Sequence, residues 1–299
     1  MTAPRRILPG TIYLLTRRCS EQRFFLHPSA LTTEIFQYLL AVAANRYGIL
    51  VHAVCVLSNH YHLVVTDPRA ELPAFMQYLD SLVARATNAS IGHWEGFWSS
   101  EGSYSAVTHA APDDVVAKIA YTLANPVAAG LVQHGEEWPG LRTAPALLGG
   151  TTITVCRPKR FFRAKGDMPD TAQLVLATPP GFSSPEAFRS AVVDAVQRLE
   201  AKLRRDAQAE QRTFLGRARV LAQHPFARPA GAAPRRNLNP RVAGRDTWLR
   251  VEALLELTEF QRAYREALDA RRAGALDVVF PAGTYLLRIQ HCVRCALLA

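Results

Sequence analysis

The sequence has 299 residues, 49% hydrophobic and 20% charged, which is the composition of an ordinary globular protein. Its five cysteines are scattered and odd in number, which excludes a disulfide framework, and no run reaches the roughly 18 apolar residues of a membrane span. The net charge of +10 is uneven, because residues 1–150 hold 10 Lys and Arg against 11 Asp and Glu, and residues 151–299 hold 25 against 14. We therefore expect a cytoplasmic protein without a signal peptide or membrane contact, and a polyanionic partner bound mainly through the second half.

Strand and helix patterns alternate through the first half. Apolar spacing predicts strands over residues 11–17, 49–57, 60–66 and 103–109, with a two-residue Ser-Asn turn joining the second and third. Helical spacing predicts helices over 29–48, over 71–90 and from 112 to a stop at Pro126. This order predicts an α+β domain over residues 1–150, a ferredoxin-like antiparallel sheet with two helices on one face. The last helix would reach the sheet from outside that repeat.

A change of composition near residue 150 predicts a second unit over residues 151–299. It would be a basic, mainly helical DNA-binding extension that begins with a linker. Helical patterns cover residues 185–222 and 246–273, and a Pro/Ala/Arg-rich stretch, 224–241, separates them. Residues 275–290 predict a short terminal hairpin.

A pair of histidines, His60 and His62, flanks Tyr61 in the third predicted strand. Residues two apart in a strand point to the same face. The opposite face would pack under the helices, so the imidazoles would lie on a face where packing gives no reason for them. The pair supplies only two of the ligands that a metal needs. Taken alone, it fits two interpretations, a metal site or histidines packed in a core.

Tyr121 and Asn125 lie one turn apart on the last predicted helix of the first half, so they share a helix face. An amide oxygen from Asn125 would complete a mixed His, His, O site that can hold Mg²⁺ or Mn²⁺ together with a substrate phosphate. Beside such a phosphate, the Tyr121 phenol would be a competent nucleophile. The alternative is an ordinary core tyrosine on an amphipathic helix.

Four stretches in this order and spacing resemble the REP-associated tyrosine transposases, a family of single-tyrosine HUH transposases. The main two are LSNHYHLVV and AYTLANPVAAGLV, and GTIYLLTRR and GHWEGFWSS fall where the family has its first strand and its Trp-Gln-Gly-Arg-Phe-Lys-Ser loop. The resemblance covers about residues 7–148. The chain departs from the family pattern at Leu57 and Ser58, which replace Met-Pro, in the less basic WEGFWSS loop, and at Ala128, where the family commonly has Arg.

The resemblance implies that His60, His62 and Asn125 hold Mg²⁺ or Mn²⁺ and that Tyr121 attacks single-stranded, hairpin-forming DNA. The products would be a 5′-phosphotyrosine and a free 3′-hydroxyl, formed without a nucleotide cofactor by an enzyme that works as a homodimer. The expected function is therefore a metal-dependent DNA endonuclease and strand transferase in DNA transposition and recombination. The alternative is a domesticated, non-catalytic DNA-binding protein or regulator, because a first half with a balance of −1 is a poor polyanion binder.

Basic and aromatic residues outside the metal site are the candidates for DNA contact through charge and base stacking. They are Arg17, Arg18, Trp94, Trp98, Arg157, Lys159, Arg160, Arg163, Arg235 and Arg236. For the two tryptophans the alternative is a small core under a loop. For the basic run around Phe161 and Phe162 the alternative is a solvated surface anchored by two packed rings.

Overall fold

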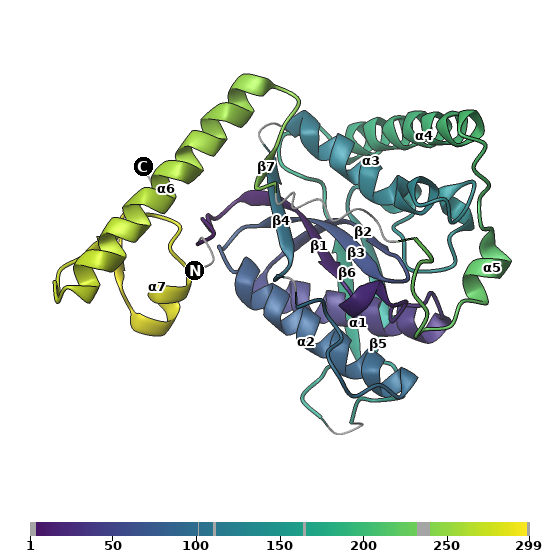
Figure 1. Cartoon of the computed structure of the whole chain (residues 1–299), viewed down its shortest axis with the longest axis horizontal. Helices are drawn as coiled ribbons and strands as arrows, with labels where there is room; N and C mark the ends of the chain where they lie inside the picture. Colours follow the sequence, from purple (N-terminus) through teal and green to yellow (C-terminus); the bar gives the residue numbers. More distant parts are fainter. Residues whose placement is uncertain (1–3, 101, 110–111, 164–165, 232–239, 298–299) are drawn as a thin grey trace.

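A computed structural model describes residues 4–100, 102–109, 112–163, 166–231 and 240–297, and its centre is a seven-stranded sheet (Figure 1). The strands lie in the order β5-β6-β2-β3-β1-β4-β7. Their bounds are Thr11–Arg18 (β1), Leu50–Val56 (β2), His60–Asp67 (β3), Ser105–His109 (β4), Thr151–Cys156 (β5), Thr171–Leu176 (β6) and Val242–Ala243 (β7). The central pairs β1–β3, β1–β4 and β2–β3 are antiparallel, as is β5–β6, whereas β6 joins β2 and β7 joins β4 in parallel.

Within the described residues, five long helices and two short ones accompany the sheet. They are Ala30–Tyr47 (α1), Leu72–Ile91 (α2), Pro112–Ala128 (α3), Pro185–Ala209 (α4), Arg217–Leu221 (α5), Thr247–Arg272 (α6) and Leu286–His291 (α7). Single 3-10 turns lie at Ser20–Gln22, Gly135–Glu137 and Pro145–Leu147. The predicted α+β class, the antiparallel centre and the two helices on one face, α1 and α2, are confirmed. None of the helices in the described ranges is long and apolar enough to cross a membrane.

Local signals fix the first elements where the sequence predicts them. The Ser29 hydroxyl accepts a hydrogen bond from the backbone N–H of Thr32 and caps α1. Gly48 ends the helix with a φ of 67°, a left-handed conformation that favours glycine. A two-residue turn at Ser58 and Asn59 then closes the β2–β3 hairpin, and the Leu57 N–H donates to the His60 carbonyl across it.

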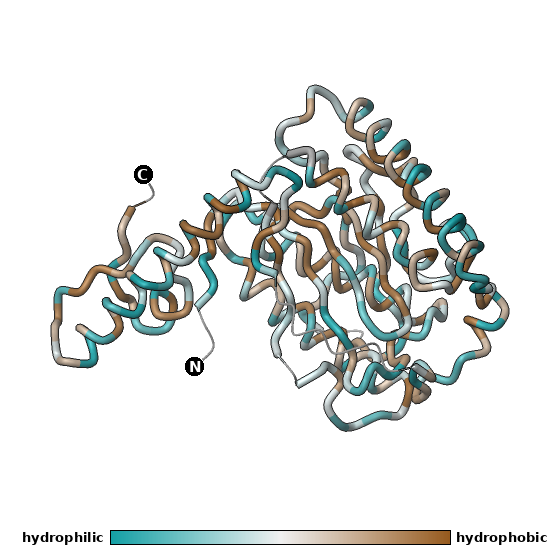
Figure 2. The backbone as a smooth tube through the Cα atoms, turned by 45° about the horizontal axis from the view of Figure 1, so that its top comes forward, coloured by the Kyte–Doolittle hydropathy of each residue, from teal (hydrophilic) through white to brown (hydrophobic). Residues whose placement is uncertain are grey.

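The second face of the sheet is covered as well, which the sequence does not predict. Apolar side chains on this face, among them Leu14 and Val64, pack under α3 and α4, where Phe188 is completely buried. Hydrophobic residues accordingly concentrate in the strands, and α4 alternates between hydrophilic and hydrophobic turns (Figure 2). Since β5, β6 and α4 all follow residue 150, strands and helices from both predicted units build this one layered body.

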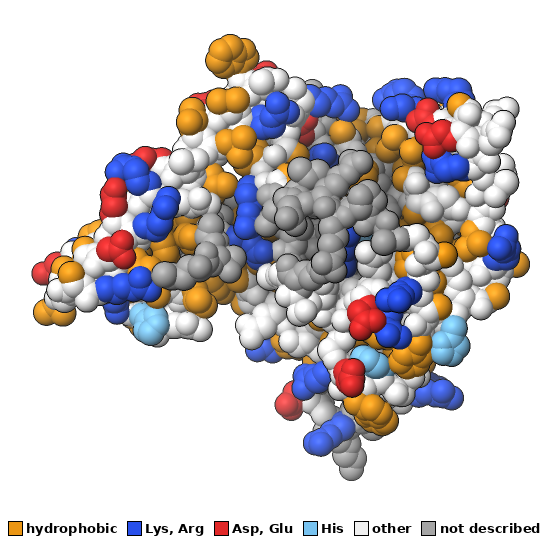
Figure 3. Space-filling view, viewed as in Figure 1, with side chains coloured by type: hydrophobic (Ala, Val, Ile, Leu, Met, Phe, Trp, Pro, Cys, Tyr) orange, Lys and Arg blue, Asp and Glu red, His pale blue; other side chains and the backbone are white. Residues whose placement is uncertain are grey.

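The end of the chain forms a C-terminal lobe, residues 247–297, which stands beside the sheet (Figure 1). The predicted terminal hairpin is wrong: β8 (Val279–Phe280) pairs in parallel with β9 (Arg294–Cys295), and α7 connects them. The strands are two residues long, too short for period-two patterning to show. Figure 3 shows the charged side chains on one face of the molecule. Lys and Arg mix with Asp and Glu over α6 and α4, and Lys and Arg also gather between the lobe and the sheet.

Candidate active site

The face of β3 that carries the histidines is shared with β1. Register pairs His62 with Thr16 and His60 with Arg18, and directly paired residues of neighbouring strands point to the same face. The two imidazole rings stand perpendicular to each other with their centroids 4.9 Å apart. Both rings therefore lie where a single small ligand could reach them.

Hydrogen bonds hold the two imidazoles through the same ring atom. His60 Nδ1 lies 2.7 Å from the Asn59 Oδ1, and His62 Nδ1 lies 2.9 Å from the Thr16 hydroxyl. An amide oxygen only accepts, so His60 carries its proton on Nδ1 and keeps a lone pair on Nε2. Metal-binding histidines in proteins usually form such a hydrogen bond through the ring nitrogen that does not bind the metal, which here would be Nδ1.

Helix α3 brings Asn125 and Tyr121 to this pair. The Asn125 amide donates to His62 Nε2 over 3.1 Å, which requires a lone pair on that nitrogen and places the His62 proton on Nδ1 as well. The Tyr121 ring centroid lies 5.4 Å from that of His62. Asn125 is only 6% exposed, whereas Tyr121 is 43% exposed, so the amide is enclosed and the phenol remains open to an incoming ligand.

The electrostatics favour neutral imidazoles. Burial lowers the pKa of His60 to about 4, and the neighbouring Arg18 contributes to the same shift. Burial also holds the pKa of His62 well below its usual value, with smaller contributions from His60 and Arg18. Neutral imidazole is the form that binds a metal.

The donor set fits a divalent ion with open coordination positions. Across the described ranges, no group of three His, Cys, Asp or Glu side chains could hold a metal ion. A third protein ligand beside His60 and His62 would be the amide oxygen of Asn125, once the amide turned to present its oxygen in place of the nitrogen that donates to His62 Nε2. Two imidazoles and an amide oxygen leave positions for water and phosphate oxygens, an arrangement open to Mn²⁺ and Mg²⁺.

Helix α3 continues past Pro126, where the sequence predicts its end. The proline lies in the last turn and the helix runs on to Ala128. Because proline has no backbone N–H, it costs the helix only one hydrogen bond, to the carbonyl four residues earlier. The next turn still closes, since the Ala129 N–H donates to the Asn125 carbonyl over 2.9 Å. Gly130, with a φ of 69°, then ends the segment in a left-handed conformation.

Residues from both halves of the chain fix the position of α3. The Arg142 guanidinium donates to the Leu123 carbonyl of α3 over 2.7 Å and lies 3.3 Å from the Glu200 carboxylate of α4. The same carboxylate accepts from the Gly135 N–H. Both charged side chains are nearly buried, so this Arg142–Glu200 clamp ties the helix of Tyr121 to α4. Sequence reasoning missed the clamp because its members lie far apart in the chain.

Arg17 and Trp98, two of the predicted DNA contacts, lie on the other side of the sheet from the histidines. Arg17 Nε lies 3.7 Å from Asp80 Oδ2, and its guanidinium also donates to the Gly102 carbonyl. The Trp98 indole donates to the Asp80 carbonyl and packs on the Tyr61 ring. Strand alternation accounts for this, because Arg17 and Arg18 point to opposite faces.

Asp80 gives the fold a pH-dependent stability that can be measured. Burial raises its pKa to about 7, although the Tyr61 hydroxyl and Arg17 both lower it. With an ordinary value of 3.8 in the unfolded chain, the native state holds a proton between about pH 4 and 7 that the unfolded chain releases. Stability from this group is present at acid pH and falls by up to about 1.4 kcal/mol per pH unit across that window.

We expect Asp80→Asn to remove this slope. The difference in unfolding free energy, wild type minus variant, should fall from pH 4 to 7 and level off above pH 7. Urea unfolding at four pH values measures it, and comparing the two proteins cancels the opposite trend of the buried histidines. Asp277→Asn, at an exposed aspartate, is the matched control. Parallel pH curves for wild type and Asp80→Asn would contradict the prediction.

The remaining candidates for DNA contact are dispersed. Arg18 is exposed beside His60, and Trp94 is 89% exposed. Arg157, Lys159, Arg160 and Arg163 lie in the β5–β6 loop, which packs on α1 through the Tyr38–Phe162 ring contact and hence on the face opposite the histidines. Arg157 is engaged with Asp170, and the other three are exposed. Arg235 and Arg236 lie outside the described residues.

Comparisons with known proteins give two partial likenesses. No family model matches the chain, and no curated protein matches it either. A REP-associated tyrosine transposase bound to a REP hairpin is similar in structure, with a TM-score of 0.40 and 16% identity over 47% of this chain and 81% of that one. A candidate transposase from Deinococcus radiodurans R1 gives a TM-score of 0.28 and 22% identity over 36% and 85% of the two chains. Both solved structures are described as transposases. We therefore argue the function of this chain from its own side chains.

Proposed function

We propose that this protein is a divalent-metal-dependent endonuclease and strand transferase that cuts single-stranded or hairpin DNA through Tyr121. The observation that carries the proposal is the meeting of two neutral imidazoles, whose Nε2 lone pairs point away from their Nδ1 hydrogen bonds, with an exposed phenol whose ring centroid lies 5.4 Å from that of His62. Among the described residues, the Nε2 of His60 is free, and that of His62 accepts from the Asn125 amide, a hydrogen bond that a metal ion would replace. A plain histidine core would not need an open tyrosine beside it. The motifs that resemble the REP-associated tyrosine transposases contain the same residues.

The chemistry of the chain's own residues can be written as one displacement. The Tyr121 oxygen attacks the phosphorus of a DNA phosphodiester, the bond from phosphorus to the 3′ oxygen breaks, and a 5′-phosphotyrosine forms. The phenol proton leaves to solvent, and the departing 3′ oxygen takes up a proton to become a hydroxyl. Reversal of the same step on a second 3′-hydroxyl would rejoin strands, so no nucleotide cofactor is required.

His60, His62 and Asn125 would hold a Mg²⁺ or Mn²⁺ ion at this site. When bound, such an ion polarises the phosphate and offsets the charge that grows on it during displacement. Arg18 is exposed on the same face beside His60 and can pair with a second phosphate oxygen. We include homodimerisation in this proposal because the family that the motifs resemble works as homodimers.

A second candidate, a DNA-binding protein that has lost cleavage, has one observation in its favour. The first half has a charge balance of −1, and the structure commits Arg17 to an internal pairing with Asp80. Such a protein would bind DNA without forming a covalent bond to it.

A covalent-adduct assay separates the two functions. We expect the full chain, mixed with a DNA hairpin that has randomised single-stranded flanks, to form a denaturation-resistant adduct in Mn²⁺ or Mg²⁺ and none in EDTA. Since the phosphotyrosine stays on the downstream fragment, only DNA labelled at its 3′ end should label the protein. Calorimetry with Mn²⁺ alone should show binding to the wild type and not to His60→Gln/His62→Gln.

His291→Gln is the matched control, because this histidine lies exposed on α7, in the C-terminal lobe. It should retain both the adduct and the Mn²⁺ binding of the wild type. DNA binding without an adduct in either metal would favour the second candidate. An adduct that carries the 5′ label would overturn the proposed polarity of attack.

A further inference from the structure

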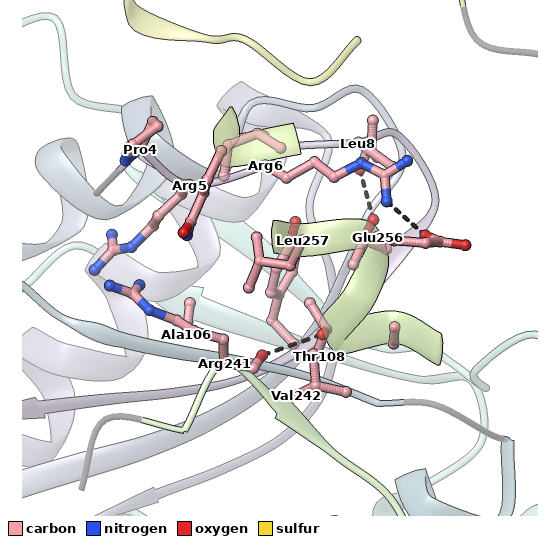
Figure 4. Close-up of a pocket in the computed structure, with 15 residues that line it drawn as sticks. Pro4, Arg5, Arg6, Leu8, Ala106, Thr108, Arg241, Val242, Glu256 and Leu257 are labelled. Carbon is pink, nitrogen blue, oxygen red and sulfur yellow. Dashed lines mark hydrogen bonds and ion pairs between the residues drawn. The ribbon is translucent and has the colours of Figure 1, made fainter. Parts of the chain in front are cut away.

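A cavity of about 170 Å³ lies away from the candidate active site, between the N-terminal segment, the β4–β7 edge and α6 (Figure 4). Its sheet wall includes Tyr13 and Ala106, and Tyr13 belongs to the cluster that packs against α1 and α2. The cavity therefore opens on the sheet face opposite His60 and His62. At this volume it suits a ligand smaller than most drug-sized molecules.

Positive charge dominates the wall of this cavity. Three arginines line it, Arg5, Arg6 and Arg241, against one carboxylate, Glu256. Arg6 is paired with that carboxylate over 2.6 Å. Among the described residues, no carboxylate pairs with Arg5 or Arg241, whose guanidinium groups lie side by side at one end of the cavity (Figure 4).

The fold holds the side chain of Arg5 and the backbone of Arg241. The guanidinium of Arg5 lies over the Tyr104 ring, 3.9 Å from its centroid, and donates to the Tyr104 carbonyl. The backbone of Arg241 leads into β7, and its carbonyl accepts from the Thr108 N–H of β4 over 2.9 Å. The Arg5 guanidinium is therefore held by the Tyr104 ring and carbonyl, and the backbone of Arg241 is fixed at the edge of β4.

The electrostatics of the two arginines indicate that an anion completes the cavity. Burial, together with the charge of Arg5, lowers the pKa of Arg241, so the two like charges are held together at a cost that a bound anion would offset.

We propose that this cavity is a phosphate-binding site for a single nucleotide phosphate, contacted by the guanidinium groups of Arg5 and Arg241. Arginine forks match phosphate oxygens with paired, charge-assisted hydrogen bonds. Apolar side chains of Ile7 and Leu257 form other parts of the wall and suit the sugar or base beside the phosphate. The phosphate can come from a free mononucleotide or from the 5′ end of a DNA strand.

Calorimetry and thermal melting of the full chain at constant ionic strength test the site with three probes. They are inorganic phosphate, thymidine 5′-monophosphate, and a short oligothymidine with either a 5′-phosphate or a 5′-hydroxyl. We expect phosphate and thymidine monophosphate to bind and raise the melting temperature. A preference of at least about tenfold for the 5′-phosphorylated oligonucleotide over thymidine monophosphate would identify a DNA end, and equal affinity would identify a free nucleotide.

Arg241→Gln should weaken phosphate binding at least about tenfold, because it removes a charged hydrogen-bond donor. Its melting temperature without ligand should not fall, since the repulsion with Arg5 is removed too. Arg228→Gln removes an exposed charge away from the cavity and should bind as the wild type does. Tyr121→Phe should also bind normally, so failure of the proposed nuclease would leave this site standing. Unchanged affinity in Arg241→Gln, or no binding of any probe, would overturn it.

Discussion

Replacing Tyr121 with phenylalanine is expected to abolish the covalent DNA adduct and to lower cleavage by at least about three orders of magnitude. The variant keeps the ring that packs 5.4 Å from His62, between centroids, and loses only the oxygen that would attack phosphorus. Because Tyr121 is 43% exposed, the change leaves no buried cavity, and stability and DNA affinity should stay close to those of the wild type. Single-turnover cleavage, adduct formation and fluorescence anisotropy measure the three quantities.

Tyr47→Phe is the matched control for this substitution. Tyr47 is the last residue of α1, on the opposite side of the sheet, so the same loss of a hydroxyl should change neither cleavage nor binding. An adduct that persists in Tyr121→Phe would assign the nucleophile to another residue. Cleavage that persists without an adduct would assign it to water.

Removing residues 151–299 is expected to unfold the protein. The truncation deletes β5 and β6, exposes the edge of β2, and strips α4 from the second sheet face. Phe188 alone, completely buried on that face, should cost about 3–5 kcal/mol as Phe188→Ala, a large part of the stability of a typical domain. Circular dichroism and urea unfolding of chain 1–150 should show no cooperative transition.

A chain ending at residue 244 is the control for that truncation. It lacks only the C-terminal lobe and keeps the sheet with all four helices α1 to α4, so cooperative unfolding should persist. Cooperative, native-like unfolding of chain 1–150 would show that the first half is self-sufficient. The role of positive charge in DNA binding is therefore better tested by Arg-to-Gln changes in the whole chain than by deletion.

Local patterns were enough to predict the central part of the fold. The Ser29 cap and Gly48 stop bound α1, and the Ser-Asn turn, together with strand alternation, puts His60 and His62 on one face. Each of these depends on residues only a few positions apart. The same alternation also separates Arg17 from Arg18, a distinction that a search for basic residues alone overlooks.

The partners of the site residues could not be predicted, because they come from distant parts of the chain. Nothing in β3 specifies that Thr16 would bond His62, or that α4 would cover the face beneath Tyr121. An amphipathic helix shows that it has an apolar face without showing what that face packs against. Two-residue strands such as β7 carry no periodicity at all, so the cavity beside it was also beyond prediction.

The Arg142–Glu200 clamp has a consequence for how substitutions distribute along the chain. Helix α4 carries none of the proposed site residues, yet it holds the helix that carries the phenol. A map of inactivating substitutions should therefore show two clusters, one at the histidines and tyrosine and another near Glu200, some eighty residues beyond Tyr121 in the chain. Changes in the second cluster would reduce turnover by moving the phenol relative to the imidazoles, while the affinity for DNA stayed the same.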